Sequence, residues 1–75
     1  MNTVIEDFKT GFFGVSIVLK KDDITKLIEC LLHLRDDPDV DHFHCIGDYS
    51  STPGVADISF GVQDESIPDN MDIQF

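Results

Sequence analysis

The spacing of apolar residues changes from a strand period to a helix period within GFFGVSIVLKKDDITKLIECLLHLRDDP, residues 11–38. In residues 12–20, large apolar side chains alternate with mostly smaller or polar ones, and β-branched residues are frequent. This pattern predicts a strand with one strongly apolar face. The residues on that face are Phe13, Val15, Ile17 and Leu19.

The second half of the stretch predicts an amphipathic helix that ends near Arg35. Its apolar residues recur three and four positions apart, which places them on one helix face. Asp22 is the expected N-cap, and Asp23 adds negative charge at the positive end of the helix dipole. The helix must stop before Pro38, because the residue preceding a proline disfavours the helical conformation. The apolar face carries Ile24, Leu27, Ile28, Leu31 and Leu34.

Four further runs predict short strands, separated by loops rich in turn residues. The expected order is strand, strand, helix, strand, strand, strand in one domain, residues 1–75. One helix cannot cover both faces of a five-stranded sheet. The sequence therefore predicts an α+β fold in which one largely antiparallel sheet packs a single helix on one face. The further strands are expected at residues 3–8, 40–46, 55–63 and 71–75, with loops at 47–54 and 64–70.

Charge is distributed unevenly along the chain. All five Lys and Arg residues lie in residues 1–35 together with five acids, whereas residues 36–75 hold the other ten acids of a chain of net charge −10. This acidity argues against binding to nucleic acids and to anionic membranes, because both carry negative phosphates. It favours association with a basic protein partner. Solubility alone is the alternative reason for the acidity.

The compartment and the state of the thiols follow from two other features. No apolar run is long enough to span a bilayer, and Glu6 and Asp7 stand where a signal peptide would carry positive charge. A cytoplasmic protein is therefore expected. Its two cysteines, Cys30 and Cys45, are expected to be reduced, buried thiols rather than a disulfide.

The most distinctive motif is VDHFHC, residues 40–45. If Phe43 and Cys45 point toward the helix, strand alternation places His42 and His44 together on the open face of the sheet. The same alternation puts several apolar residues of other strands on that open face. These are Phe12, Val18, Ile46 and Val55.

Three interpretations of the histidine pair are open from the residues alone. Asp57 or Asp72 could complete a zinc site, but the chain has no CxxC or HExxH spacing, so no metal and no cofactor is expected. Catalysis needs a shielded pocket, which one helix on one sheet does not offer, so we expect no enzymatic activity. The favoured interpretation is a pair of exposed imidazoles beside carboxylates, on a face that can bind a partner.

The order of elements resembles the bacterial immunity proteins of polymorphic toxin systems, family thirty-two. The resemblance covers residues 11–75: a helix with Leu spacing, an acidic break, the strand HFHC (residues 42–45), a Gly-containing hairpin and the closing segment NMDIQF. Members have an HFHL-like strand, so Cys45 stands where Leu is expected, and the hairpin lacks the Trp that some members carry. The resemblance implies a small cytoplasmic protein that neutralises a toxin without chemistry of its own.

Charge and resemblance together predict an acidic immunity protein that binds a basic toxin domain. The alternative is a self-associating regulatory or structural module, a homodimer formed through the open sheet face. Partner contacts are expected from acids of the C-terminal half, from the two strand histidines, and from the only tyrosine. The expected partner-binding residues are Asp41, His42, His44, Asp48, Tyr49, Asp57, Asp64, Glu65, Asp69 and Asp72.

Overall fold

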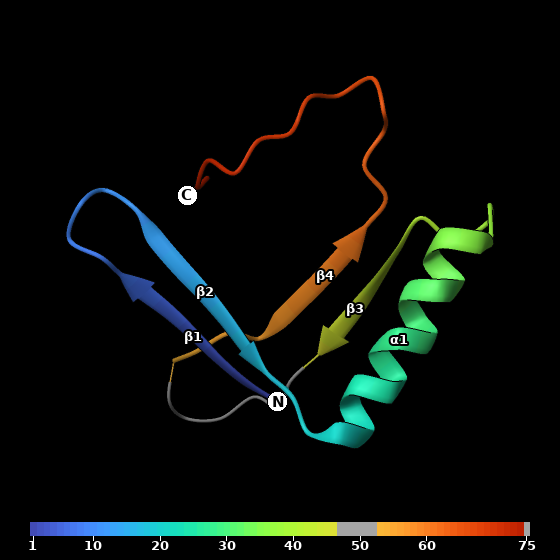
Figure 1. The fold of residues 1–75 in the computed structure, drawn as a ribbon, viewed down its shortest axis with the longest axis horizontal. Helices are drawn as coiled ribbons and strands as arrows, with labels where there is room; N and C mark the ends of the chain where they lie inside the picture. The colour runs from blue at the N-terminus through green and yellow to red at the C-terminus, as the bar shows by residue number, and fades with distance from the viewer. Residues whose placement is uncertain (47–52, 75) are drawn as a thin grey trace.

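The computed structural model describes residues 1–46 and 53–74, without the side chain of Ile46, and has the predicted α+β class. Two strands precede the single helix and two follow it (Figure 1). This order agrees with the predicted order of the first five elements. The elements are β1 (Asn2–Asp7), β2 (Phe13–Val18), α1 (Lys21–Asp36), β3 (His42–Ile46) and β4 (Asp57–Gly61).

β1 and β2 form an antiparallel hairpin whose turn contains two residues with positive φ. Lys9 has a φ of 62° and Gly11 a φ of 92°. The Phe8 N–H donates a hydrogen bond to the Phe12 carbonyl oxygen at 3.1 Å, which closes the turn. A carboxylate oxygen of Asp7 accepts a hydrogen bond from the Lys9 N–H at 2.8 Å. Such a bond from an Asp to the backbone two residues later stabilises the turn locally.

α1 begins slightly earlier than the sequence predicts, so Asp22 is not its N-cap. The N-cap is Lys20, whose carbonyl oxygen accepts the Ile24 N–H at 3.0 Å and whose side chain makes no capping hydrogen bond. Asp22 lies in the first turn, where its charge still faces the positive end of the helix dipole. The helix ends at Asp36, before Pro38, as the restriction on the residue preceding a proline predicts.

β3 and β4 form the second antiparallel pair. Their register places Phe43 opposite Phe60 and His44 opposite Ser59. The rings of Phe43 and Phe60 stack with their centroids 5.3 Å apart. α1 contacts the β3 side of this pair, so the aromatic face of β3–β4 and the apolar face of the helix line a common space.

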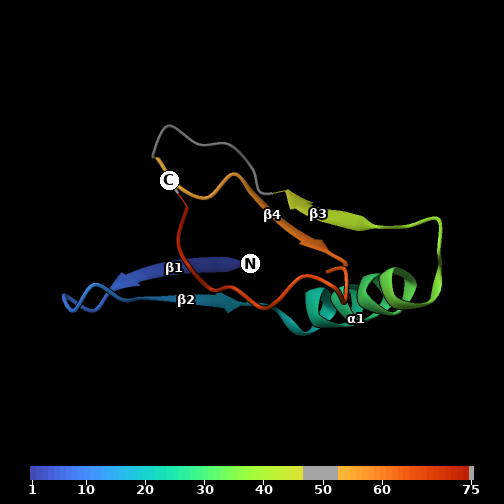
Figure 2. The same cartoon turned by 90° about the horizontal axis from the view of Figure 1, so that it is seen from above.

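The four strands form two separate two-stranded sheets, so the prediction of one continuous sheet is wrong. Figure 2 shows the β1–β2 hairpin and the β3–β4 pair at different levels of the molecule, and no strand of one pairs with a strand of the other in the described part of the chain. Alternation determines which side chains share a face of a strand. It does not specify which strand edges pair, and the prediction failed at that step.

The strand expected at residues 71–75 is absent from 71–74, the part of it that the structure describes. Hydrogen bonds of short range occupy this region instead. The Ile67 N–H donates to the Asp64 carbonyl oxygen at 3.0 Å, and the Asp72 N–H donates to the Asn70 side-chain oxygen at 2.7 Å. The Asn70 side chain, by binding a nearby backbone N–H, competes with strand pairing at the start of this segment.

Little of the apolar surface is covered. Leu34 is the one buried apolar side chain among the described residues, with 8% of its surface exposed. Both cysteines are free thiols, as predicted, but the prediction that they are buried is wrong: Cys30 is exposed and Cys45 only half-buried. No helix in the described ranges is long and apolar enough to cross a membrane.

Candidate partner-binding site

The two histidines of β3 lie on one face of the strand, as alternation predicts. Their rings meet edge to face with centroids 5.1 Å apart. Asp57 joins them from β4, with its Oδ2 atom 2.8 Å from His44 Nδ1. This contact runs diagonally between the strands, because the register places Ser59 directly opposite His44 and Asp57 opposite Ile46. The structure therefore brings His42, His44 and Asp57 together.

Asp41 extends this group at the beginning of β3. Its Oδ1 atom lies 2.5 Å from Nδ1 of His42. The hydrogen bond with His42, and then the attraction of the imidazolium charge, hold the pKa of the Asp41 carboxyl below its usual range. Asp41 is therefore ionised at neutral pH and presents a negative charge to solvent.

The opposite face of β3–β4 is apolar and borders a cavity of 740 Å³. Phe43 and Cys45 of β3 contribute to its wall, together with Phe60 of β4 and with Leu27 and Cys30 of α1. Burial raises the pKa of the Cys45 thiol, so the thiol is protonated at neutral pH. His44 also reaches this cavity, whereas Asp41, His42 and Asp57 are exposed to solvent.

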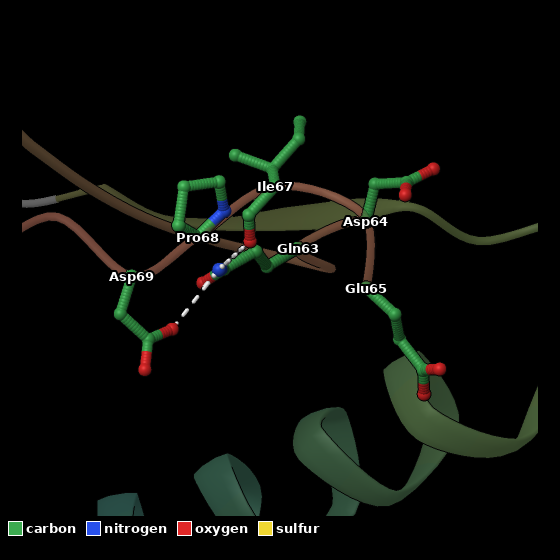
Figure 3. Close-up of a pocket in the computed structure, with 6 residues that line it drawn as sticks. All are labelled: Gln63, Asp64, Glu65, Ile67, Pro68 and Asp69. Carbon is green, nitrogen blue, oxygen red and sulfur yellow. Dashed lines mark hydrogen bonds between the residues drawn. The ribbon is translucent and has the colours of Figure 1, made fainter.

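Three of the expected acids lie in a loop of residues 63–69, which surrounds a cavity of 410 Å³ (Figure 3). The Gln63 side-chain nitrogen donates to a backbone carbonyl oxygen of the loop at 2.8 Å and to the Asp69 carboxylate at 3.0 Å. These bonds hold the two ends of the loop together. The side chains of Glu65 and Asp69 extend to the same side of the loop, and that of Asp64 to the other.

Asp64 is held in its ionised form by the residue two positions later. The Ser66 hydroxyl donates to Asp64 Oδ1 at 2.6 Å, and the Ser66 N–H donates to the same atom at 2.8 Å. These two hydrogen bonds lower the pKa of the Asp64 carboxyl. The bonds also determine the shape of the turn, so the charge of Asp64 is presented from a defined position.

The loop and the histidine strand meet at one end of the sheet. The Val62 N–H donates to the Asp41 carbonyl oxygen at 3.0 Å, and Gly61 pairs with His42. The acidic loop therefore leaves β4 beside the start of β3. We call the combined set the acidic region. It consists of Asp41, His42, His44, Asp57, Asp64, Glu65 and Asp69.

Three of the expected residues are not part of the acidic region. Asp72 was expected on a strand beside the histidines, but that strand is not formed, and the C-terminal segment runs back toward the side of the β1–β2 hairpin (Figures 1 and 2). Asp48 and Tyr49 lie outside the described residues. Sequence reasoning also missed Gln63, since a single Gln after a strand has no pattern that would indicate its role in holding the loop.

Exposed carboxylates suit the recognition of Lys and Arg side chains, with which they form strong charge-assisted hydrogen bonds. In residues 1–46 and 53–74, no group of three or more His, Cys, Asp or Glu side chains is placed to hold a metal ion. Comparisons with protein-family models, curated proteins and solved structures found no match. The function is therefore inferred from charge and geometry.

Proposed function

We propose that this protein is a small acidic inhibitor that binds a basic protein partner through the acidic region and has no catalysis of its own. A cytoplasmic immunity protein that neutralises a basic toxin is the specific form of this proposal. The observation that carries it is the ten acids of residues 36–75, a segment without a single Lys or Arg. Because their charge is not neutralised within the segment, a partner with complementary charge would be attracted strongly.

The geometry supports a protein partner rather than a small ligand. The acidic region is spread over two strands and a loop, and the side chains of His44 and Asp57 are each about half exposed. Dispersed charges of this kind fit a surface that carries several Lys and Arg side chains. A cleft that normally binds the phosphates of a nucleic acid is one such surface.

The first experiment isolates the partner and measures its association rate. The tagged protein captures partners from the lysate of the cells that encode it, and stopped-flow fluorescence then follows binding of the purified partner at increasing NaCl. The test variant combines Asp64→Asn, Glu65→Gln and Asp69→Asn. We expect the association rate of this variant to be lower by about tenfold at low salt, because steering by charge accelerates encounter by factors of this order.

The matched control removes the same number of negative charges from residues 1–35, where basic and acidic residues are equal in number. It combines Glu6→Gln, Asp22→Asn and Glu29→Gln, and it should change the association rate by less than about twofold. Wild-type association should also slow steeply as salt increases, and the test variant should show a weaker salt dependence. Equal effects of the two triple variants, or a rate that does not respond to salt, would contradict the proposal.

A further inference from the structure

We infer that the β1–β2 hairpin is a dimerisation surface, covered by the same hairpin of a second copy of this chain. The inference does not depend on the acidic region, because it concerns different residues. The surface, called the hairpin face below, is one side of the two-stranded sheet. The register pairs Ile5 with Val15, and alternation puts the neighbouring large side chains of β2 on the same side. The hairpin face consists of Ile5, Phe13, Val15 and Ile17.

The hairpin face is exposed although it is apolar. Val15 has 71% of its surface exposed and Ile5 63%, in the middle of a regular hairpin. Ile17, at the end of β2, also lines the 740 Å³ cavity beside α1, so the apolar surface continues from the hairpin toward the centre of the molecule. A contiguous apolar surface of this kind differs from singly scattered apolar residues and indicates an interface.

The chain exposes more surface than is typical of a folded monomer of its mass. The chain exposes 6971 Å². A folded monomer of 8.4 kDa typically exposes about 4,600 Å², so the excess is about 2,400 Å². A stable interface of ordinary size buries about 800 Å² on each partner. The excess is therefore large enough for a dimer interface in which each copy covers the apolar surface of the other.

Charge identifies the second copy as the occupant. Residues 1–35 carry equal numbers of basic and acidic residues, and Asp7, opposite Phe13 at the rim of the hairpin face, forms an ion pair with Lys9. Two copies that met through their C-terminal halves would bring ten acids against ten acids. Contact between the two hairpins avoids this repulsion, and in Figure 1 the turn of the hairpin extends away from α1 and β3.

If both copies use the same surface, the arrangement is a two-fold dimer, in which the hairpin face of one copy packs against the hairpin face of the other. Val15, the most exposed residue of the face, would then lie near the axis and contact the partner hairpin. The acidic regions of the two copies would remain accessible. Each copy of the dimer could therefore bind its own basic partner.

Sedimentation velocity over a range of protein concentrations tests the inference. The wild-type protein should be a dimer that dissociates on dilution. Val15→Asp places two like charges near the two-fold axis and should raise the dissociation constant at least about 100-fold, while Val15→Ala should raise it about tenfold by removing apolar contact. The control is Ser16→Asp, which adds the same charge on the opposite side of the same strand and should leave the dissociation constant within about threefold of wild type.

Circular dichroism of each variant at the same concentrations shows whether it is folded. If Val15→Asp does not fold, the comparison of Val15→Ala with Ser16→Ala decides the question, since both remove little volume. A wild-type protein that stays monomeric at about 200 µM, where even a weak dimer would form, overturns the inference. Equal weakening by Val15→Asp and by Ser16→Asp overturns it as well, because the effect would then not depend on the hairpin face.

Discussion

Several carboxylates in the structure are held by residues adjacent or close to them in sequence. Asp41 contacts His42, and the Arg35 guanidinium donates hydrogen bonds of 2.6 and 2.9 Å to the two oxygens of Asp36. These groups are exposed, and ion pairs in that setting add little to the free energy of unfolding. Their main effect is on ionisation: the Arg35 contact, like the His42 contact, lowers the pKa of the adjacent carboxyl. Local contacts thus keep acids charged at the pH where a basic partner would bind.

The contact between Asp41 and His42 leads to a prediction about titration. In His42→Ala, the pKa of Asp41 should rise toward its usual range, because the hydrogen bond and the attraction of the imidazolium are both lost. NMR of the side-chain carboxyl carbons during an acid titration measures this value. His44→Ala is the control, because His44 contacts Asp57 instead. An Asp41 titration that is the same in His42→Ala and wild type would contradict the assignment.

The sign of the effect on stability follows from the same pKa. Asp41 has a lower pKa in the folded protein, so its ionised form contributes to stability above the usual Asp range. That contribution is lost as the pH falls through the folded-state pKa. The difference in stability between wild type and His42→Ala should therefore diminish as the solution is acidified.

At the scale of elements, the apolar periodicity of the sequence predicts the four strands and the helix. The C-terminal segment has an alternating apolar pattern but forms no strand over residues 71–74. The β1–β2 turn depends on the left-handed Gly11, and no atom outside its chain neighbours would lie within 4 Å of a β-carbon added there. A substitution at Gly11 therefore changes stability through strain in the backbone alone, because the added β-carbon would make no steric contact. Residues 71–74 alternate but form no strand, and the Asn70 side chain accepts a hydrogen bond from the Asp72 N–H instead.

Gly11→Ala should lower the free energy of unfolding by about 1 kcal/mol, since an alanine in the left-handed conformation is strained. Gly54→Ala is the matched control: a β-carbon there also meets nothing within 4 Å, and Gly54 lacks a positive φ. It should leave the free energy of unfolding unchanged or raise it by up to about 1 kcal/mol, because alanine restricts the unfolded chain and is not strained there. Urea unfolding at one fixed protein concentration measures both, because dimerisation would link stability to concentration. Equal losses in the two variants would show that the turn does not require the left-handed conformation.

At the scale of the whole molecule, charge and apolar surface are separated along the chain. The first half, with no net charge, holds the exposed hairpin face, and the second half holds all ten uncompensated acids. The two proposed associations therefore depend on different forces. Dimerisation removes apolar surface from water against a repulsion between acidic halves, whereas binding of a basic partner uses attraction.

Salt should consequently affect the two associations in opposite directions. Raising NaCl from about 20 to about 300 mM should tighten the homodimer, because screening weakens the repulsion between copies. The same change should weaken binding of the basic partner by at least about tenfold. Sedimentation velocity and stopped-flow binding on one protein preparation measure the pair of responses. If both associations weakened with salt, the dimer would not have the apolar interface inferred for it.

Within the candidate site, strand alternation alone was sufficient to place His42 and His44 on one face and Phe43 on the other. The position of Asp57 followed from the expectation of an adjacent antiparallel strand. The prediction for Asp72 failed because its placement required a strand at residues 71–75, and the structure shows none over residues 71–74. The link between Asp41 and the 63–69 loop could not be predicted, because it depends on where β4 ends.

The amino-acid sequence by itself determined the α+β class, the order of the first five elements, the faces of the strands and the charge asymmetry. These properties depend on residue spacing and composition over short stretches, where steric rules and periodicity act directly. Only the tertiary structure decided that the strands form two sheets and that the hairpin face is uncovered. Those features depend on which strand edges pair between segments far apart in the sequence, and the apolar pattern within one strand does not specify its partner.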